Sequence, residues 1–252
     1  GDGWKSPGGD LSYRPPLISF QLWSVYLVTG ASPIVARWTM VFFSALVAPL
    51  LYLVARRLLG GRGDVALLVA VAWVLYPPAI WYASRPLTEN TAALLSVAGL
   101  GAFLWTAKSR SPYAAVATGG LWALAALNRP VYFLLPLALL AAQLALSRFG
   151  PLSWTWNWRK WALAAVAFVI VMSPWTVRNY IEHGVFMPTT SGSGKLLWMS
   201  NATLDHPDVQ AGKYYKNPEH VLTVEEGENE AATDRLRRRL AIDEIKDNWR
   251  LL

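Results

Sequence analysis

The chain has 252 residues, of which 54% are hydrophobic and only 15% charged, and it contains no cysteine. Soluble domains carry about 25% charged residues, so this composition excludes a disordered chain, a coiled coil and most soluble enzymes, and the missing cysteine excludes a disulfide framework and thiolate zinc sites. The net charge of +7 does not indicate nucleic-acid binding, because it divides into +10 over residues 1–200 and −3 over residues 201–252.

Long apolar runs in the first part of the chain have the length of membrane-spanning helices. A bilayer crossing takes about 17 to 25 apolar residues. An apolar stretch beginning near residue 113 is divided at Asn128-Arg129-Pro130, because Pro130 removes a helix donor and disfavours helical geometry at the residue before it. We therefore predict six crossings, at 34–55, 65–83, 87–107, 113–128, 131–147 and 161–175.

Basic residues collect in alternate connections between these segments. Cytoplasmic loops are enriched in Lys and Arg, so the connections near residues 56–62, 108–110 and 148–160 are predicted to be cytoplasmic. The other connections, at 84–88 and 128–130, together with everything after residue 176, then lie on the outer side. The protein is thus expected to be a multi-pass protein of the plasma membrane with an extracytoplasmic active face.

The chain divides into three predicted parts. Residues 1–32 are the end of an outer loop with a juxtamembrane helix at 17–29, which is too short to span and would move the basic loops outside if it did. Residues 33–176 form the transmembrane bundle. Residues 177–252 form an extracytoplasmic segment that ends in an amphipathic helix, since apolar residues recur there at helical spacing. Because the chain starts at Gly1 without Met or a signal peptide, we expect an upstream segment.

Glu89 is one of only two acidic residues between Leu11 and Ile181. It lies at the predicted outer start of an apolar helix, where a carboxylate is costly to desolvate. Two interpretations stay open. The carboxylate either sits in the first helical turn, where the helix dipole favours it, or points into an outward cavity and orients a sugar hydroxyl or an acceptor.

Five cations lie on the predicted outer side, which should be poor in them. Four are arginines, whose planar guanidinium gives paired hydrogen bonds to phosphate oxygens. The alternative is that each extends to lipid headgroups or pairs with Glu89 or Glu182. The five are Arg14, Arg85, Arg129, Arg178 and Lys195.

A Gly/Ser stretch precedes Trp198 near the start of the C-terminal part. Its sequence, SGSGK at 191–195, lacks the G-x-x-x-x-G-K-[ST] spacing of a nucleotide-binding loop. We instead expect a flexible loop that folds over a membrane-bound substrate.

These strings together resemble the lipid-carrier-dependent glycosyltransferases of the dolichyl-phosphate-mannose protein mannosyltransferase type, which include bacterial aminoarabinose transferase-like members. The resemblance covers nearly the whole chain. The matching pieces are, in order, Arg14-Pro15-Pro16-Leu17, LYLVARRLLG at 51–60, Leu87-Thr88-Glu89 after Pro77-Pro78, GGLWALAALNRP at 119–130, and PW..RNY..HG followed by TTSGSGKLLWMSNA within 174–202.

The resemblance implies an all-α integral membrane protein with the multi-helix bundle of the GT-C fold. It implies an inverting hexosyl- or pentosyltransferase that takes a sugar from a polyprenyl-phosphate carrier and attaches it to a protein, lipid or glycan acceptor. Segment 17–29 then corresponds to the family's second juxtamembrane helix. The family's catalytic aspartate lies upstream of Arg-Pro-Pro, before the start of this chain, so neither Asp2 nor Asp10 is assigned as the base.

The resemblance also suggests roles for individual residues. Glu89 is the expected acceptor- or sugar-positioning residue, and Arg14, Arg129 and Arg178 are expected to bind the carrier phosphate. No organic cofactor is implied, whether a divalent metal takes part stays open, and no metal ligands are assigned. The partners expected are membrane lipids, the polyprenyl-phosphate sugar donor and the acceptor, without nucleic acid. Further site candidates are Arg85, Asn179, Tyr180, Lys195, Trp198 and Asn201.

Two other function classes stay open. A transporter or flippase for a lipid-linked or anionic solute also uses broken helices and intramembrane charges. A catalytically silent scaffold subunit is the third, and an upstream segment without an acidic pair would favour it.

Overall fold

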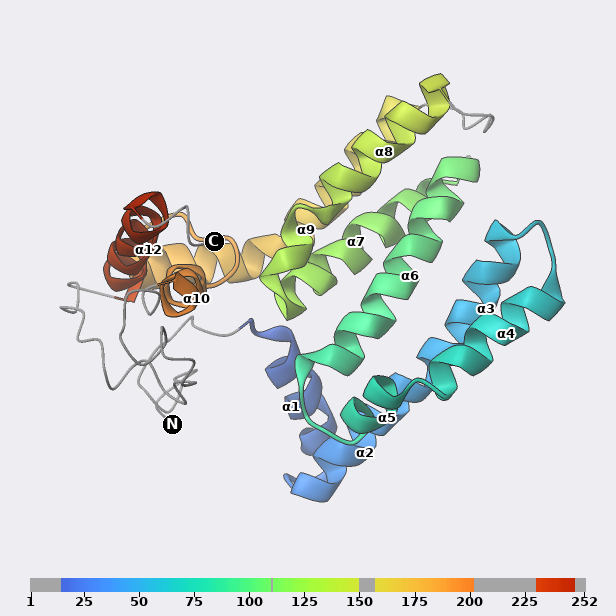
Figure 1. Cartoon of the computed structure of the whole chain (residues 1–252), viewed down its shortest axis with the longest axis horizontal. Coiled ribbons are helices and arrows are strands. Elements are labelled where there is room, and N and C mark those ends of the chain that lie inside the picture. The colour runs from blue at the N-terminus through green and yellow to red at the C-terminus, as the bar shows by residue number, and fades with distance from the viewer. Residues whose placement is uncertain (1–14, 110, 150–156, 202–229, 248–252) are drawn as a thin grey trace. The chain divides into compact units, whose positions relative to one another are not determined.

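The computed structural model describes residues 15–109, 111–149, 157–201 and 230–247, and every regular element among them is a helix (Figure 1). The chain forms two compact units, which are described in turn: a first unit of residues 15–174 and a second unit that begins at Trp175. The expectation of an all-helical protein is therefore confirmed over the described residues.

The first unit contains α1 to α8 and most of α9, which runs on into the second unit. Among its described residues, Pro opens several helices at the first helical position, where its missing N–H costs nothing. The elements are α1 (Leu17–Thr29), α2 (Pro33–Ala45), α3 (Val47–Leu58), α4 (Gly63–Val74), α5 (Pro77–Ala83), α6 (Thr88–Lys108), α7 (Pro112–Asn128), the 3₁₀ helix η1 (Pro130–Phe133), α8 (Leu135–Phe149) and α9 (Trp158–His183).

Three helical stretches in the described residues are long and apolar enough to cross a membrane. They are Pro33–Leu58, which joins α2 and α3, together with α6 and α9. The pair α4 and α5 would make a fourth, although its two helices are bent by 56°. The protein is thus a membrane protein by the length and composition of these helices.

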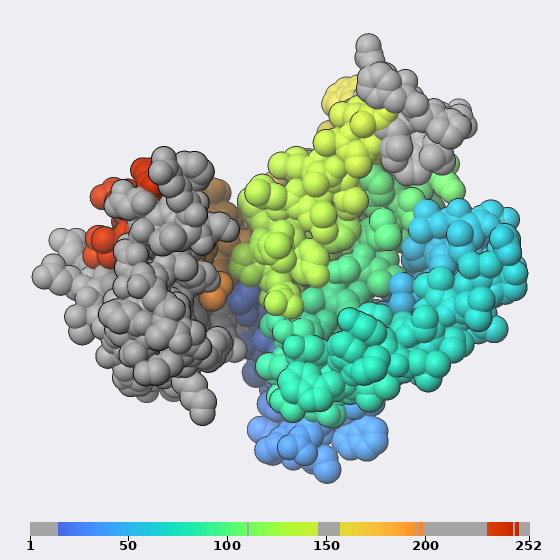
Figure 2. Space-filling view, in the orientation of Figure 1, coloured from blue at the N-terminus to red at the C-terminus, as the bar shows by residue number. Residues whose placement is uncertain are grey.

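Figure 2 shows α4, α5 and α8 on the visible face of the first unit. Large apolar side chains on these helices are exposed, including Leu67 and Leu68 on α4, Ile80 on α5 and Leu137 on α8. Large apolar side chains exposed on several helices are expected to face lipid rather than water.

Two predicted segments differ from the helices observed. The stretch predicted at 65–83 is divided into α4 and α5, because Pro77 and Pro78 cannot continue the hydrogen bonding of α4. The last predicted crossing, 161–175, is longer and continues through Pro174 to His183. Pro174 removes the backbone donor that would bond the Ile170 carbonyl, and that carbonyl accepts from the Ser173 hydroxyl instead, at 2.9 Å.

The packed centre of the first unit is the helical hairpin of α6 and α7, which run side by side (Figure 1). Thr106 and Thr118 share a buried hydrogen bond of 2.8 Å between the two helices. Gly99 on α6 leaves room for the Trp122 ring, since a Cβ there would lie 2.8 Å from it. Close approach through small residues is the usual packing of membrane helices.

Lys160 joins the start of α9 to the end of α6. Its side chain is buried, and its Nζ donates to the carbonyls of Thr106 and Ser109 at 2.8 and 2.7 Å. The last carbonyls of a helix have no partner within it and carry partial negative charge, so an ammonium group there is stabilising.

The second unit contains the end of α9, α10 (Gly192–Asn201) and α12 (Glu230–Asp247). The expectation of a flexible glycine loop at 191–195 is wrong, because Gly192 begins α10. Asp234 of α12 accepts a hydrogen bond from the Gly194 backbone N–H at 2.8 Å. This contact satisfies one of the unpaired N–H groups in the first turn of α10, which stabilises the helix. A helix expected near the end of the chain is present as α12.

Candidate functional site

Glu89 and Arg129, two of the predicted site residues, form an ion pair. Glu89 lies in the first turn of α6, and Arg129 directly follows α7. The Arg129 Nη1 and Glu89 Oε1 atoms are 3.5 Å apart, and the two side chains are 43% and 31% exposed. One of the alternatives considered for the arginines, pairing with Glu89, therefore applies to Arg129.

The α6–α7 hairpin explains why these residues meet. The two helices are joined by a short connection, so the start of α6 lies beside the end of α7. Asn128 fixes this arrangement: it is fully buried, and its Nδ2 donates to the Thr88 carbonyl at 2.9 Å. The hydrogen bond links the residue before Glu89 to the residue before Arg129. The geometry of the ion pair is thus set by a buried amide.

The second oxygen of Glu89 is the least satisfied atom of the pair. Oε2 is inaccessible to solvent and has no hydrogen-bond partner among the described residues. A buried carboxylate oxygen without a donor costs free energy. Glu89 therefore carries a buried acceptor without a donor, directly beside the cation of Arg129.

Helix α1 contributes a second polar group next to α6. The Thr91 hydroxyl donates to Gln21 Oε1 at 2.8 Å. The Nε2 atom of the same amide is buried and has no partner within the described part of the chain. The start of α6 therefore carries an unsatisfied acceptor on Glu89, and its neighbour α1 carries an unsatisfied donor on Gln21.

Arg85 and Asn90 organise the turn between α5 and α6. The guanidinium of Arg85 lies 3.6 Å from the ring centroid of Trp81, a cation–π contact between exposed residues. Asn90 is buried, and its Nδ2 donates to the carbonyls of Tyr82 and Arg85 at 2.8 and 3.3 Å. Asn90 therefore fixes the turn that leads to Glu89. This role was not predicted, because a neutral amide in the first turn of a helix does not by itself indicate a functional or structural contact.

In the second unit, Arg178 and Asn179 lie near the end of α9. Arg178 Nη1 donates to Asn179 Oδ1 at 3.0 Å, and its guanidinium is 5.0 Å from the Trp175 ring centroid. Asn179 is fully buried and donates to the carbonyls of Met187 and Thr189 at 3.0 and 3.1 Å. These contacts give Asn179 a clear structural role, which is to hold the segment after α9.

The remaining predicted residues have different surroundings. Tyr180 on α9 is exposed, and Trp198 on α10 is buried. Lys195 and Asn201 also belong to α10. Arg14 lies outside the described residues. Within the described ranges, no three His, Asp or Glu side chains are grouped so that they could hold a metal ion.

We compared the chain with known proteins. No protein-family model, curated protein or solved structure matches it.

The ion pair leaves Arg129 able to bind an anion. A guanidinium carries five N–H donors in a planar fork, and the contact with Glu89 is made through Nη1. Its side chain is 43% exposed, so a phosphate could reach the remaining donors. A half-exposed cation and a partly exposed carboxylate thus occur together at one end of the α6–α7 hairpin.

Proposed function

We propose that this protein is a glycosyltransferase of the GT-C type, which moves a sugar from a polyprenyl-phosphate carrier to a protein, lipid or glycan acceptor. The single observation that carries the proposal is the Glu89–Arg129 ion pair at the end of two packed apolar helices. The order of sequence motifs that resembles the family supports it. In this proposal the bundle has six crossings and the pair faces the extracytoplasmic side.

The proposed reaction breaks the bond between the sugar and the carrier phosphate. The acceptor hydroxyl attacks the anomeric carbon, the polyprenyl phosphate leaves with the bonding electrons, and a carboxylate base takes the hydroxyl proton. Arg129 stabilises the charge that develops on the leaving phosphate, as preorganised donors do in a site of low dielectric. Glu89 orients Arg129 and accepts a hydrogen bond from the sugar or the acceptor. The roles of Arg14 and Arg178 as phosphate ligands stay predictions from the resemblance.

The proposal is tested by sugar transfer in proteoliposomes. The protein is reconstituted with whatever natural sequence precedes Gly1 and follows Leu252, and a set of polyprenyl-phosphate sugars is supplied. Arg129→Gln should lower the transfer rate about 10²- to 10³-fold, as loss of one charge-stabilising donor does. Glu89→Gln should lower it about 10²-fold, because misplaced groups lose that much.

A matched control comes from a second ion pair in the same unit. Arg62 and Asp64 are 3.3 Å apart and about two-thirds exposed. Replacing both with neutral amide side chains, Arg62→Gln with Asp64→Asn, leaves the net charge unchanged and should not alter transfer. Wild-type rates for both Arg129→Gln and Glu89→Gln would refute the assignment.

A transporter or flippase for a lipid-linked or anionic solute is the second candidate. The 56° bend between α4 and α5 favours it, since discontinuous helices form the binding sites of many transporters. Uptake of solute without sugar transfer in the same proteoliposomes would support this candidate against the first.

A further inference from the structure

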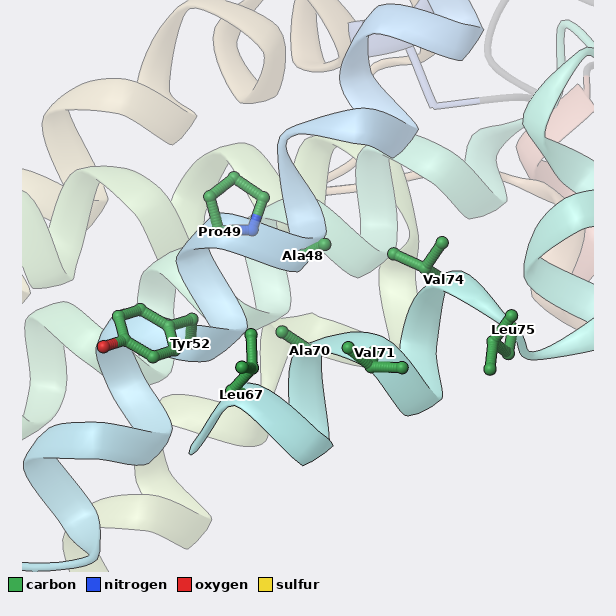
Figure 3. A pocket seen from close by; sticks show the side chains of 8 residues that line it. All are labelled: Ala48, Pro49, Tyr52, Leu67, Ala70, Val71, Val74 and Leu75. Carbon is green, nitrogen blue, oxygen red and sulfur yellow. The ribbon is translucent and has the colours of Figure 1, made fainter. Parts of the chain in front are cut away.

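An open groove lies between helices α3 and α4 of the first unit, and its lining is wholly apolar. Its volume is about 410 Å³, and no polar surface lines it. Figure 3 shows side chains from both helices along it, with Tyr52 and Leu67 at the left of the view and Leu75 at the right. Along α4 the groove extends from Leu67 to Leu75, the residue after the helix, and these eight steps of 1.5 Å span about 12 Å.

Small side chains from both helices line part of the groove. Ala48, Pro49 and Ala70 form part of its lining and leave space between the helices. Leu67 and Leu75 are 56% and 67% exposed at its sides. A surface of this shape in a membrane-length segment is suited to a flexible hydrocarbon chain.

A tight turn joins α3 to α4 at one end of the groove. The turn contains Gly60 and Gly61, both with positive φ, which glycine adopts without steric cost. Arg56 and Arg57 lie in the last turn of α3, just before it, and both are exposed. They follow Tyr52 by four and five residues, so they lie about one helical turn beyond the end of the lining. Arg56 and Arg57 therefore lie near one end of the apolar groove.

The other charged residues of the turn neutralise each other. Arg62 pairs with Asp64 at 3.3 Å. Arg56 and Arg57 form no ion pair with any described carboxylate. The local charge available to a ligand is therefore that of two arginines.

We propose that this groove binds an anionic phospholipid of the bilayer. One acyl chain lies along α3 and α4, and the headgroup phosphate contacts Arg56 and Arg57. The apolar lining gives no preference among lipids, because lipid tails are as apolar as the groove. The two guanidinium groups give the selectivity, since basic residues at a membrane surface attract anionic headgroups. This site is separate from the Glu89–Arg129 pair and does not depend on the proposed sugar transfer.

The test uses phosphatidylglycerol that carries a diazirine in one acyl chain. The chain is reconstituted in phosphatidylcholine nanodiscs containing this probe, or a phosphatidylcholine with the same diazirine. After irradiation, the cross-linked residues are identified by mass spectrometry. We expect cross-links on residues 48–75 and a higher yield from the anionic probe.

Two pairs of variants separate charge from shape. Arg56→Gln with Arg57→Gln should reduce the preference for the anionic probe by about fivefold per arginine, equivalent to about 1 kcal/mol each. Arg159→Gln, at an exposed arginine of α9, is the matched control and should leave the groove cross-links unchanged. Val71→Trp fills the groove and should lower the cross-links from both probes. Val69→Trp places the same ring on an exposed position of α4 that does not line the groove.

Three outcomes would overturn the proposal. Equal cross-linking by the two probes would remove the role of charge. An anionic preference that survives the loss of Arg56 and Arg57 would place the headgroup elsewhere. Cross-links between two copies of the chain through Val71→Cys, without lipid cross-links in the groove, would show that a second copy occupies it.

Discussion

Replacing Gly119 with alanine tests the close approach of α7 to α9. A Cβ at Gly119 would overlap the carbonyl oxygen of Ala164 and lie 2.9 Å from the backbone nitrogen of Phe168. Both obstacles are backbone atoms, so no side-chain rotation relieves the overlap and the helices must separate. Gly120, the next residue, has open space at the same position.

The neighbouring glycine makes the magnitude measurable. Alanine favours a helix over glycine by about 0.5–1 kcal/mol, and this gain is common to both substitutions. The difference between Gly119→Ala and Gly120→Ala is therefore the cost of overpacking, about 1–3 kcal/mol. Gly120→Ala should be neutral or more stable than the wild type.

The free energy of unfolding of the two variants is measured in mixed micelles of a mild detergent and dodecyl sulfate, with far-ultraviolet circular dichroism as the signal. Gly119→Ala should unfold at a lower fraction of dodecyl sulfate than Gly120→Ala. Equal stability of the two variants would show that α7 and α9 do not pack through Gly119.

Other substitutions test the buried polar contacts by the same unfolding measurement. Asn128→Ala leaves the Thr88 carbonyl without its donor and should lower the free energy of unfolding by about 1–3 kcal/mol. An unchanged free energy of unfolding would contradict the stabilising role of this hydrogen bond between α6 and α7. Lys160→Met keeps the length of the side chain but removes two charge-assisted hydrogen bonds to the end of α6. It should lower the free energy of unfolding, since each such bond contributes about 1.5–3 kcal/mol. Asp234→Ala removes the acceptor for the Gly194 N–H and should cost about 0.5–2 kcal/mol, as loss of a helix cap does; loss of helical signal from α10 would accompany it.

The sequence predicts the helix break at Asn128-Arg129-Pro130 because the cause is local. Pro130 lacks a donor, and α7 ends at Asn128 while η1 begins at Pro130. The division of 65–83 has the same cause, but the apolar composition is continuous across Pro77 and Pro78 and hides it. Where α9 continues through Pro174, the Ile170 carbonyl accepts from the Ser173 hydroxyl, and no sequence pattern specifies that rotamer.

Part of the candidate site is also predictable. Glu89 and Arg129 are recognisable as charged residues beside apolar helices. In a hairpin of two antiparallel helices, the start of the first helix lies beside the end of the second, so the sequence also predicts that these two residues meet. The contact between Gln21 and Thr91 is not predictable in this way. It joins two neutral residues 70 positions apart, and neither residue type nor spacing indicates it.

The hydrogen bond between Thr106 and Thr118 has a consequence for how the protein enters its membrane. Each hydroxyl lies on a different helix, and 12 residues separate them in the chain. In hydrocarbon, a polar group without a partner is costly. A single helix carrying Thr106 would meet lipid tails without the partner that α7 supplies. Insertion of α6 and α7 as one hairpin is therefore more favourable than insertion of the two helices in succession.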